Sequence, residues 1–121
     1  SLHEATNHIA CIADRDNIIA VAGAPKKEFL GKRIGQAVEK VMEERKVTLI
    51  NKPGEDAHCK DCVVVEDGCK FKAQVIAPII AEGDPIGAVI LCSKEDGPAM
   101  GDLEIKLAET AAGFLAKQME Q

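Results

Sequence analysis

The chain has 121 residues and a formal net charge of −5, and 46% of its residues are hydrophobic and 29% charged. This length suits one domain whose core is large enough to fold without disulfides or metals. No apolar run reaches the ~18 residues of a membrane-spanning helix, and no signal peptide is visible. The negative net charge argues against a domain that binds nucleic acid directly, because the phosphate backbone is also negative. With three Phe and no Tyr or Trp, the core must be built from aliphatic side chains.

The five cysteines are an odd number in a domain that does not need disulfides. Free thiols persist in a reducing compartment, so we expect a cytoplasmic protein. The chain begins with Ser1 rather than methionine. We therefore expect residues 1–121 to be a single domain of a longer protein.

The hydrophobic pattern predicts hairpins flanked by helices. In chain order, the predicted elements are a helix over residues 1–8, strands over 9–14 and 18–22, a helix over 34–45, strands over 47–50, 62–66, 69–72, 75–81 and 86–92, and a helix from 102 to the end. Apolar runs around turn-forming Asp, Asn and Gly indicate antiparallel hairpins, and apolar residues spaced by three and four indicate amphipathic helices. Together they predict an α+β fold, with an antiparallel sheet of five or six strands and helices on both faces.

The strands over 75–81 and 86–92 are the centre of the predicted sheet. Each is apolar on both faces, which is typical of a strand covered on both sides. Gly83 can take a positive φ in the turn between them. Ile86 is expected to point to the same face as Ala88 and Ile90.

The C-terminal helix carries a wide apolar stripe. The residues that line this stripe are Leu103, Leu107, Ala111, Phe114, Leu115 and Met119. Further alanines widen the stripe, which suits packing against the sheet on one side and another helix on the other. Asp102 is the expected N-cap, without a capping box. At the other end of the chain, the histidines near the start are expected to be solvated.

One cluster of residues has the composition of a reactive or metal-binding site. Its members are His58, Cys59, Cys62 and Cys69. A C-x-x-C pair with a nearby His can bind zinc or cycle as a dithiol. However, a turn at Asp67-Gly68 would place Cys62 roughly 13 Å along the strands from Cys69, at ~3.3 Å per residue. Three alternatives therefore stay open: incidental thiols, a metal site and a redox-responsive pair. No metal is firmly predicted.

The chain lacks the recognised signatures of catalysis. It contains no G-x-S-x-G, no H-E-x-x-H and no phosphate-binding glycine loop. We therefore expect a protein that is not an enzyme and needs no cofactor.

Three stretches resemble the sensor modules known as GAF domains. The run GDPIGAVIL resembles the central GAF strands, IACIADRDNIIAVAG resembles the first hairpin of GAF and PAS sensors, and FLGKRIG resembles the connector after it. This resemblance implies a GAF-like (PAS/profilin-like) sheet of five or six antiparallel strands and a role in sensing small molecules.

A closer resemblance covers most of the chain. The runs GDPIGAV, ETAAGFLAKQMEQ and APKKEFL are similar to the C-terminal regulatory domain of the stage V sporulation protein T family, AbrB-type transcription regulators of spore-forming bacteria. The resemblance implies a regulatory half whose DNA contacts are made by an N-terminal domain absent from this chain. It also implies a homo-oligomer assembled through the terminal helices. The residues carried over to that interface are Leu2, Leu103, Leu107, Ala111, Phe114 and Leu115.

The same resemblance implies a small, unidentified effector. We expect its pocket between the sheet and the helix over 34–45, under the loop over 51–61. The predicted lining residues are Ile12, Phe29, Val38, Met42 and Ile79. Such a pocket can also be collapsed and empty. The alternative function is a thiol redox enzyme of the kind that reduces free methionine sulfoxide, or a metal or redox switch, using Cys59, Cys62 and Cys69.

Overall fold

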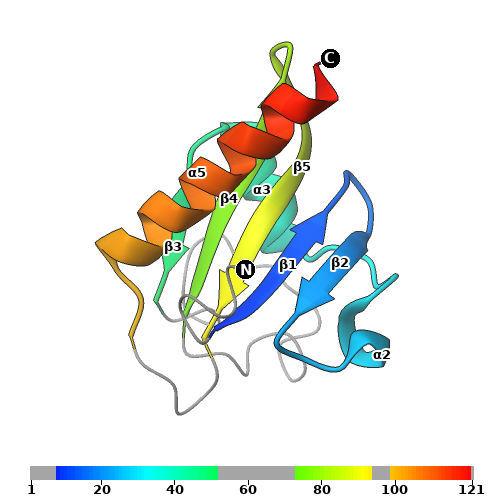
Figure 1. Cartoon of the computed structure of the whole chain (residues 1–121), viewed down its shortest axis with the longest axis vertical. Helices are drawn as coiled ribbons and strands as arrows, with labels where there is room; N and C mark the ends of the chain where they lie inside the picture. The colour runs from blue at the N-terminus through cyan, green and yellow to red at the C-terminus, as the bar shows by residue number, and fades with distance from the viewer. Residues whose placement is uncertain (1–7, 52–72, 94–98, 121) are drawn as a thin grey trace.

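The computed structural model describes residues 8–51, 73–93 and 99–120, which form a five-stranded antiparallel sheet with helices on both faces (Figure 1). The strands are β1 (Ile9–Ala13), β2 (Ile18–Ala22), β3 (Thr48–Ile50), β4 (Gln74–Ala81) and β5 (Asp84–Cys92). Their order across the sheet is β2-β1-β5-β4-β3, so β5 lies at the centre between the two hairpins. The predicted α+β fold is confirmed. The expected strands at 62–66 and 69–72, and residues 1–7 of the helix expected over 1–8, lie outside the described residues.

The hairpin of β4 and β5 turns more tightly than predicted. Ala81 pairs with Asp84, leaving a two-residue turn in which Glu82 has φ 51° and Gly83 has φ 84°. Two successive positive φ values match the right-handed twist of the paired strands, and Gly83 adopts its value without steric cost.

A β-bulge next to this turn changes the face of one side chain. Ile79 pairs with Gly87 and Ile80 pairs with Pro85, so Ile86 is the extra residue. Ile86 therefore packs with Val89 and Leu91, not with Ala88 and Ile90 as expected. The prediction for Ile86 was wrong because hydrophobic alternation does not reveal a bulge.

The two faces of the sheet carry separate hydrophobic cores. Helix α3 (Gln36–Glu44) lies behind the sheet and α5 (Asp102–Met119) crosses in front of β4 and β5 (Figure 1). The core on the α3 side includes Cys11, Val41 and Ile76. The core on the α5 side includes Val75 and Leu91. Residues adjacent in sequence on β4 thus serve opposite cores, as expected for the period of two in a strand.

Helix α3 is shorter than predicted at its start and ends sharply. Its buried residues are Ala37, Val38, Val41 and Met42. Arg45 takes a left-handed conformation with φ 61°, and its N–H donates to the Val41 carbonyl at 2.9 Å. This is the usual way to end a helix. The polar connector before α3 contains one further short helix, α2 (Lys26–Phe29).

Helix α5 packs on the sheet through small residues. Ala108, Ala112 and Ala116 recur every fourth position and are buried, so the helix axis can approach β4 and β5 closely. Gly101, rather than Asp102, is the N-cap, and its N–H donates to Glu104 Oε1 at 2.7 Å. The expected N-cap was therefore off by one residue, and the side-chain half of a capping box is present where none was expected.

Candidate functional site

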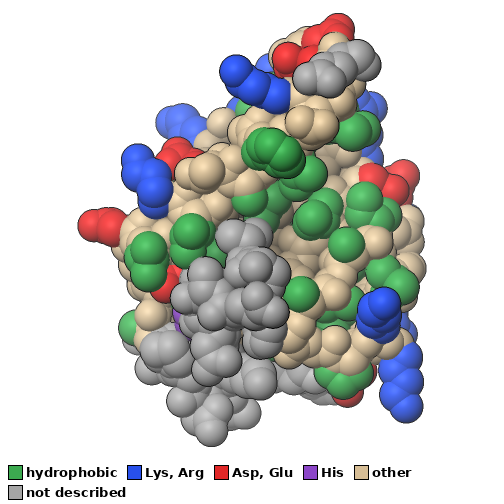
Figure 2. Space-filling view, in the orientation of Figure 1, with side chains coloured by type: hydrophobic (Ala, Val, Ile, Leu, Met, Phe, Trp, Pro, Cys, Tyr) green, Lys and Arg blue, Asp and Glu red, His purple; other side chains and the backbone are tan. Residues whose placement is uncertain are grey.

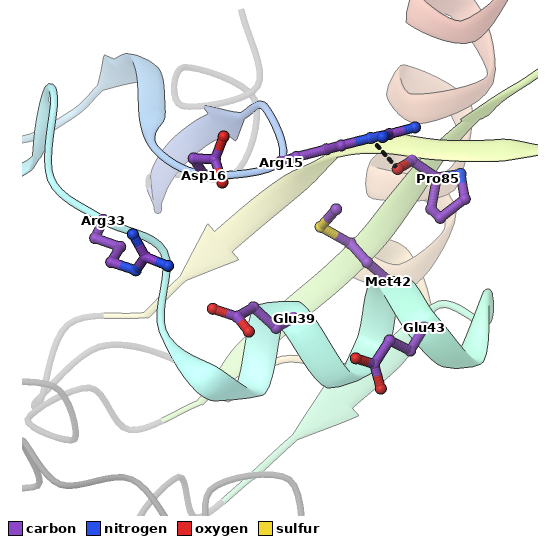
Figure 3. Close-up of a pocket in the computed structure, with 7 residues that line it drawn as sticks. All are labelled: Arg15, Asp16, Arg33, Glu39, Met42, Glu43 and Pro85. Carbon is purple, nitrogen blue, oxygen red and sulfur yellow. Dashed lines mark hydrogen bonds between the residues drawn. The ribbon is translucent and has the colours of Figure 1, made fainter.

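A cavity of about 400 Å³ opens between α3, the β1–β2 turn and the start of β5. Its volume falls within the ~300–1,000 Å³ of small-molecule sites. Figure 3 shows the lining side chains, which are Arg15, Asp16, Arg33, Glu39, Met42, Glu43 and Pro85. Five of these seven residues are charged, so the cavity is polar rather than aliphatic as predicted.

The β1–β2 turn forms one wall and is held by its own hydrogen bonds. Asp14 Oδ1 accepts from the N–H groups of Asp16 at 2.8 Å and Asn17 at 2.7 Å. These bonds to the charged form lower the pKa of the Asp14 carboxyl below its usual value. The next residue, Arg15, reaches across to β5, and its Nε donates to the Pro85 carbonyl at 3.2 Å (Figure 3). The turn therefore presents Arg15 and Asp16 from a fixed backbone.

The connector before α3 completes this wall. Backbone bonds tie it to the turn on both sides of Arg33: Ile18 N–H donates to the Lys32 carbonyl, and Ile34 N–H donates to the Asp16 carbonyl, each at 2.9 Å. These bonds hold Arg33 beside the turn, although it lies further along the chain. Arg33 extends from this connector toward α3 (Figure 3).

Helix α3 forms the opposite wall. Glu39, Met42 and Glu43 are spaced by three and four residues and so lie on one face of the helix. The carboxylate of Glu39 points toward Arg33, and Met42 points toward Arg15 and Pro85 (Figure 3). Met42 is buried, whereas the two glutamates are exposed. The cavity thus has two guanidinium groups and the Asp16 carboxylate on one wall, two glutamates on the other and an apolar floor.

The five predicted pocket residues do not come together. Phe29, Val38 and Met42 belong to the core on the α3 side. Ile12 and Ile79 belong to the core on the α5 side, so the sheet separates them from the other three. Of the predicted set, Met42 alone lines the charged cavity. The predicted roof is the loop over 51–61, of which residues 52–61 lie outside the described residues.

The outward face of α5 is a second candidate site. Of the five large hydrophobic side chains exposed among the described residues, three are on this helix. Leu103 at 62% and Phe114 at 63% share its outward side, whereas Met119 at 66% lies about 160° around the helix from Leu103, near the C-terminal end. Hydrophobic side chains follow the visible face of α5 in Figure 2. The other predicted interface residues on α5 are Leu107, Ala111 and Leu115, which are half-buried against the sheet. Leu2 lies outside the described residues.

The two described cysteines have the environment of structural thiols. Cys11 and Cys92 are buried in the α3-side core. Burial raises the pKa of Cys11 to about 11, and burial together with the neighbouring Cys11 raises the pKa of Cys92. A raised pKa keeps a thiol protonated and unreactive at neutral pH. The predicted cluster of His58, Cys59, Cys62 and Cys69 lies outside the described residues.

Sequence reasoning missed a buried polar pair. His8 was expected to be solvated, yet it is 1% exposed, and its Nε2 lies 3.6 Å from Oε2 of the buried Glu104. This pair joins the residue before β1 to the first turn of α5. The only sequence signal was a glutamate at the third position of a helix on its sheet-facing side.

Among the helices that the structure describes, none is both long and apolar enough to cross a membrane.

Structural comparison identifies the fold of the chain. It superimposes with a TM-score of 0.76 on a methyl-accepting chemotaxis protein fragment at 16% identity, covering 98% of this chain and 81% of the other. The GAF domain/HD domain protein from Geobacter sulfurreducens gives 0.72 at 15% identity, covering 98% and 86%. Type II free methionine-R-sulfoxide reductase from Thermoplasma acidophilum also gives 0.72, at 11% identity, covering 96% and 82%. At such identities these likenesses establish the fold alone.

Sequence comparison is more specific. Stage V sporulation protein T of Bacillus subtilis (strain 168) is 42% identical over 123 residues, which cover all of this chain and 64% of that relative. The chain thus spans less than two-thirds of the relative's length. The protein-family model described as stage V sporulation protein T C-terminal, transcription factor, matches residues 1–120. The chain therefore has the GAF fold and belongs to the stage V sporulation protein T C-terminal family of transcription factor domains.

Proposed function

We propose that this domain is the regulatory and oligomerising part of a sporulation transcription regulator. The observation that carries this proposal is the exposed apolar stripe of α5, with Leu103 and Phe114 each more than 60% exposed. The two residues lie eleven positions apart, so they project from nearly the same side of the helix. Large apolar side chains gathered on one helix are typical of a surface that packs against another protein.

The partner that we propose for this stripe is α5 of a second copy. The alanine ridge of α5 is already used against the sheet, so the helix has two apolar faces with different partners. Most soluble oligomers are symmetric assemblies of identical chains, and a helix face that meets its own copy forms such an interface directly. Contacts with DNA would then be made by a separate AbrB-type domain that precedes this one, in the cytoplasm.

The effector site that we propose is the charged cavity. It lies against α3, whereas α5 lies on the opposite face of the sheet. A ligand in the cavity can favour one subunit arrangement only if it binds that arrangement more tightly. The strand β5 has residues in both cores and contributes Pro85 to the cavity, so it links the cavity to the sheet-facing side of α5.

The thiol redox alternative finds no support in the described cysteines, because their raised pKa values oppose thiolate formation. The structural similarity to a free methionine-R-sulfoxide reductase is a similarity of fold alone.

The assembly proposal is tested by sedimentation equilibrium of the wild-type domain and Phe114→Asp. We expect the wild type to be a dimer or larger and Phe114→Asp to be a monomer, because a buried unpaired carboxylate opposes association. Ile19→Asp is the matched control, since it places the same acidic side chain at an exposed apolar position that lies on β2 rather than on α5. Equal association of Phe114→Asp and the control would contradict the proposal.

A further inference from the structure

We infer that the charged cavity takes a small zwitterion, a molecule that carries one carboxylate and one ammonium group. This inference rests on the proposed effector role of the cavity and names the ligand class. It follows from the placement of Arg33 opposite Glu39 and Glu43 on α3, which Figure 3 shows.

The cationic groups of the cavity come from the turn and the connector. Arg33 presents a guanidinium whose planar donors match a carboxylate in a two-point hydrogen bond. Its backbone is fixed by the flanking bonds of Lys32 and Ile34, so little freedom of the main chain is lost on binding. Arg15 donates through Nε to the Pro85 carbonyl, whereas Arg33 is the guanidinium toward which the Glu39 carboxylate points (Figure 3), so Arg33 is the carboxylate receptor that we infer.

The anionic groups come from one face of α3. Glu39 and Glu43 are spaced by four residues, so two like charges lie side by side on the helix. An ammonium group placed between the two carboxylates can donate hydrogen bonds to both and relieves their repulsion. Among the described residues, no ion pair joins Arg33 to either glutamate, so both walls have charges left for a ligand.

The charge balance excludes other simple ligand classes. Two arginines and three acidic residues line the cavity. A phosphate or another polyanion would face the carboxylates of Asp16, Glu39 and Glu43, and a polyamine would face both guanidinium groups. A zwitterion satisfies both walls at once, and Met42 and Pro85 provide an apolar floor for a short aliphatic part.

Free amino acids are the probes for this inference. We would titrate each into the ¹⁵N-labelled domain and follow its amide resonances. We expect at least one to bind with an affinity of about 1 mM, because the charged groups are exposed to water. The N-acetyl derivative lacks the ammonium group and the corresponding amine lacks the carboxylate, so each should bind at least about tenfold more weakly.

Two variants test the site itself. Arg33→Ala and Glu39→Gln should each weaken binding about tenfold or more, whereas Lys32→Ala and Glu44→Gln should not. Lys32 and Glu44 are matched controls because each lies on the same element as its counterpart and outside the cavity lining. Far-UV circular dichroism confirms that each variant is folded.

The outcomes separate this inference from the proposed function. If no amino acid at 10 mM shifts the resonances of residues around the cavity, or if binding is indifferent to Arg33 and Glu39, the zwitterion inference is overturned. In that case, self-association lost in Phe114→Asp would still support the regulatory role. A domain that is also monomeric as wild type would overturn both.

Discussion

Glu104 joins two parts of the chain that are 96 residues apart, because its Oε2 lies 3.6 Å from His8 Nε2. Its other oxygen, Oε1, accepts from the Gly101 N–H at 2.7 Å and so closes the first turn of α5. One buried carboxylate therefore caps the helix and fixes it to the start of β1. The position of α5 on the sheet depends on this residue as well as on the alanine ridge.

Replacing Glu104 with Ala should destabilise the domain by about 1–3 kcal/mol, because a helix cap and a buried polar contact are lost together. Glu104→Gln should cost less, since its amide oxygen can still accept from Gly101. Urea unfolding followed by circular dichroism measures both. Glu109→Ala, an exposed glutamate of the same helix, is the control, and an equal effect at both positions would refute the capping role.

Two glycines should respond to alanine in opposite directions. A Cβ at Gly87 would overlap the backbone carbonyl oxygen of Ala13 on the neighbouring strand, so β1 and β5 would have to separate. We expect Gly87→Ala to lower the free energy of unfolding by about 1–3 kcal/mol. A Cβ at Gly113 would meet nothing within 4 Å, so Gly113→Ala should stabilise α5 by about 0.5–1 kcal/mol. Thermal unfolding of the pair decides the point, and a shift of the same sign in both would contradict the packing described.

The buried thiols should make the domain less stable at alkaline pH. The unfolded chain releases the Cys11 proton near pH 9, whereas the folded chain retains it until about pH 11. Unfolding is therefore favoured as the pH rises through this window, by at most about 1.4 kcal/mol per pH unit for each thiol. Cys11→Ala should show a shallower decline of the free energy of unfolding between pH 9 and 11. Lysines titrate in the same pH range, but they are present in both the wild type and Cys11→Ala. If the two plots of unfolding free energy against pH run parallel, Cys11 does not ionise as described.

Asp14 should stabilise the β1–β2 turn only while it is ionised. Hydrogen bonds from Asn17 and Asp16 lower its pKa, so its contribution is present above the unfolded-state value of 3.8 and is lost as the pH falls through the lower folded-state value. We expect Asp14→Ala to melt at a lower temperature than the wild type at pH 7, with the difference shrinking below pH 4. Asp16→Ala serves as the comparison in the same turn, because its carboxylate caps neither N–H group. A difference that is independent of pH would argue against this role.

The elements that the sequence predicted well are those set by local pattern. Both hairpins and the stripes of α3 and α5 follow from apolar periodicity and turn residues, because strands and helices impose their periods on the residues they bury. The period of two is also seen in β4, where Val75, Ala77 and Ile79 share the core on the α5 side. It did not reveal that α3 covers the other face, and the predicted pocket lining therefore mixed the two cores.

The cavity itself was not predictable in this way. It depends on backbone bonds that bring Arg33 beside Asp16 and on the angle at which α3 presents Glu39. In the sequence these residues are ordinary surface charges, and a charged loop is usually just solvated. The burial of His8 was missed for the same reason, since its partner Glu104 is distant in the chain.

Native mass spectrometry of the wild-type domain tests the central claim most directly, because it counts subunits and detects retained small molecules in one spectrum. We predict a dimer or larger assembly at micromolar concentration, which Phe114→Asp converts to single chains. Added mass that is lost on denaturation would identify a retained effector. A wild-type domain that remains a single chain at every concentration would contradict assembly through α5 and, with it, the proposed regulatory role.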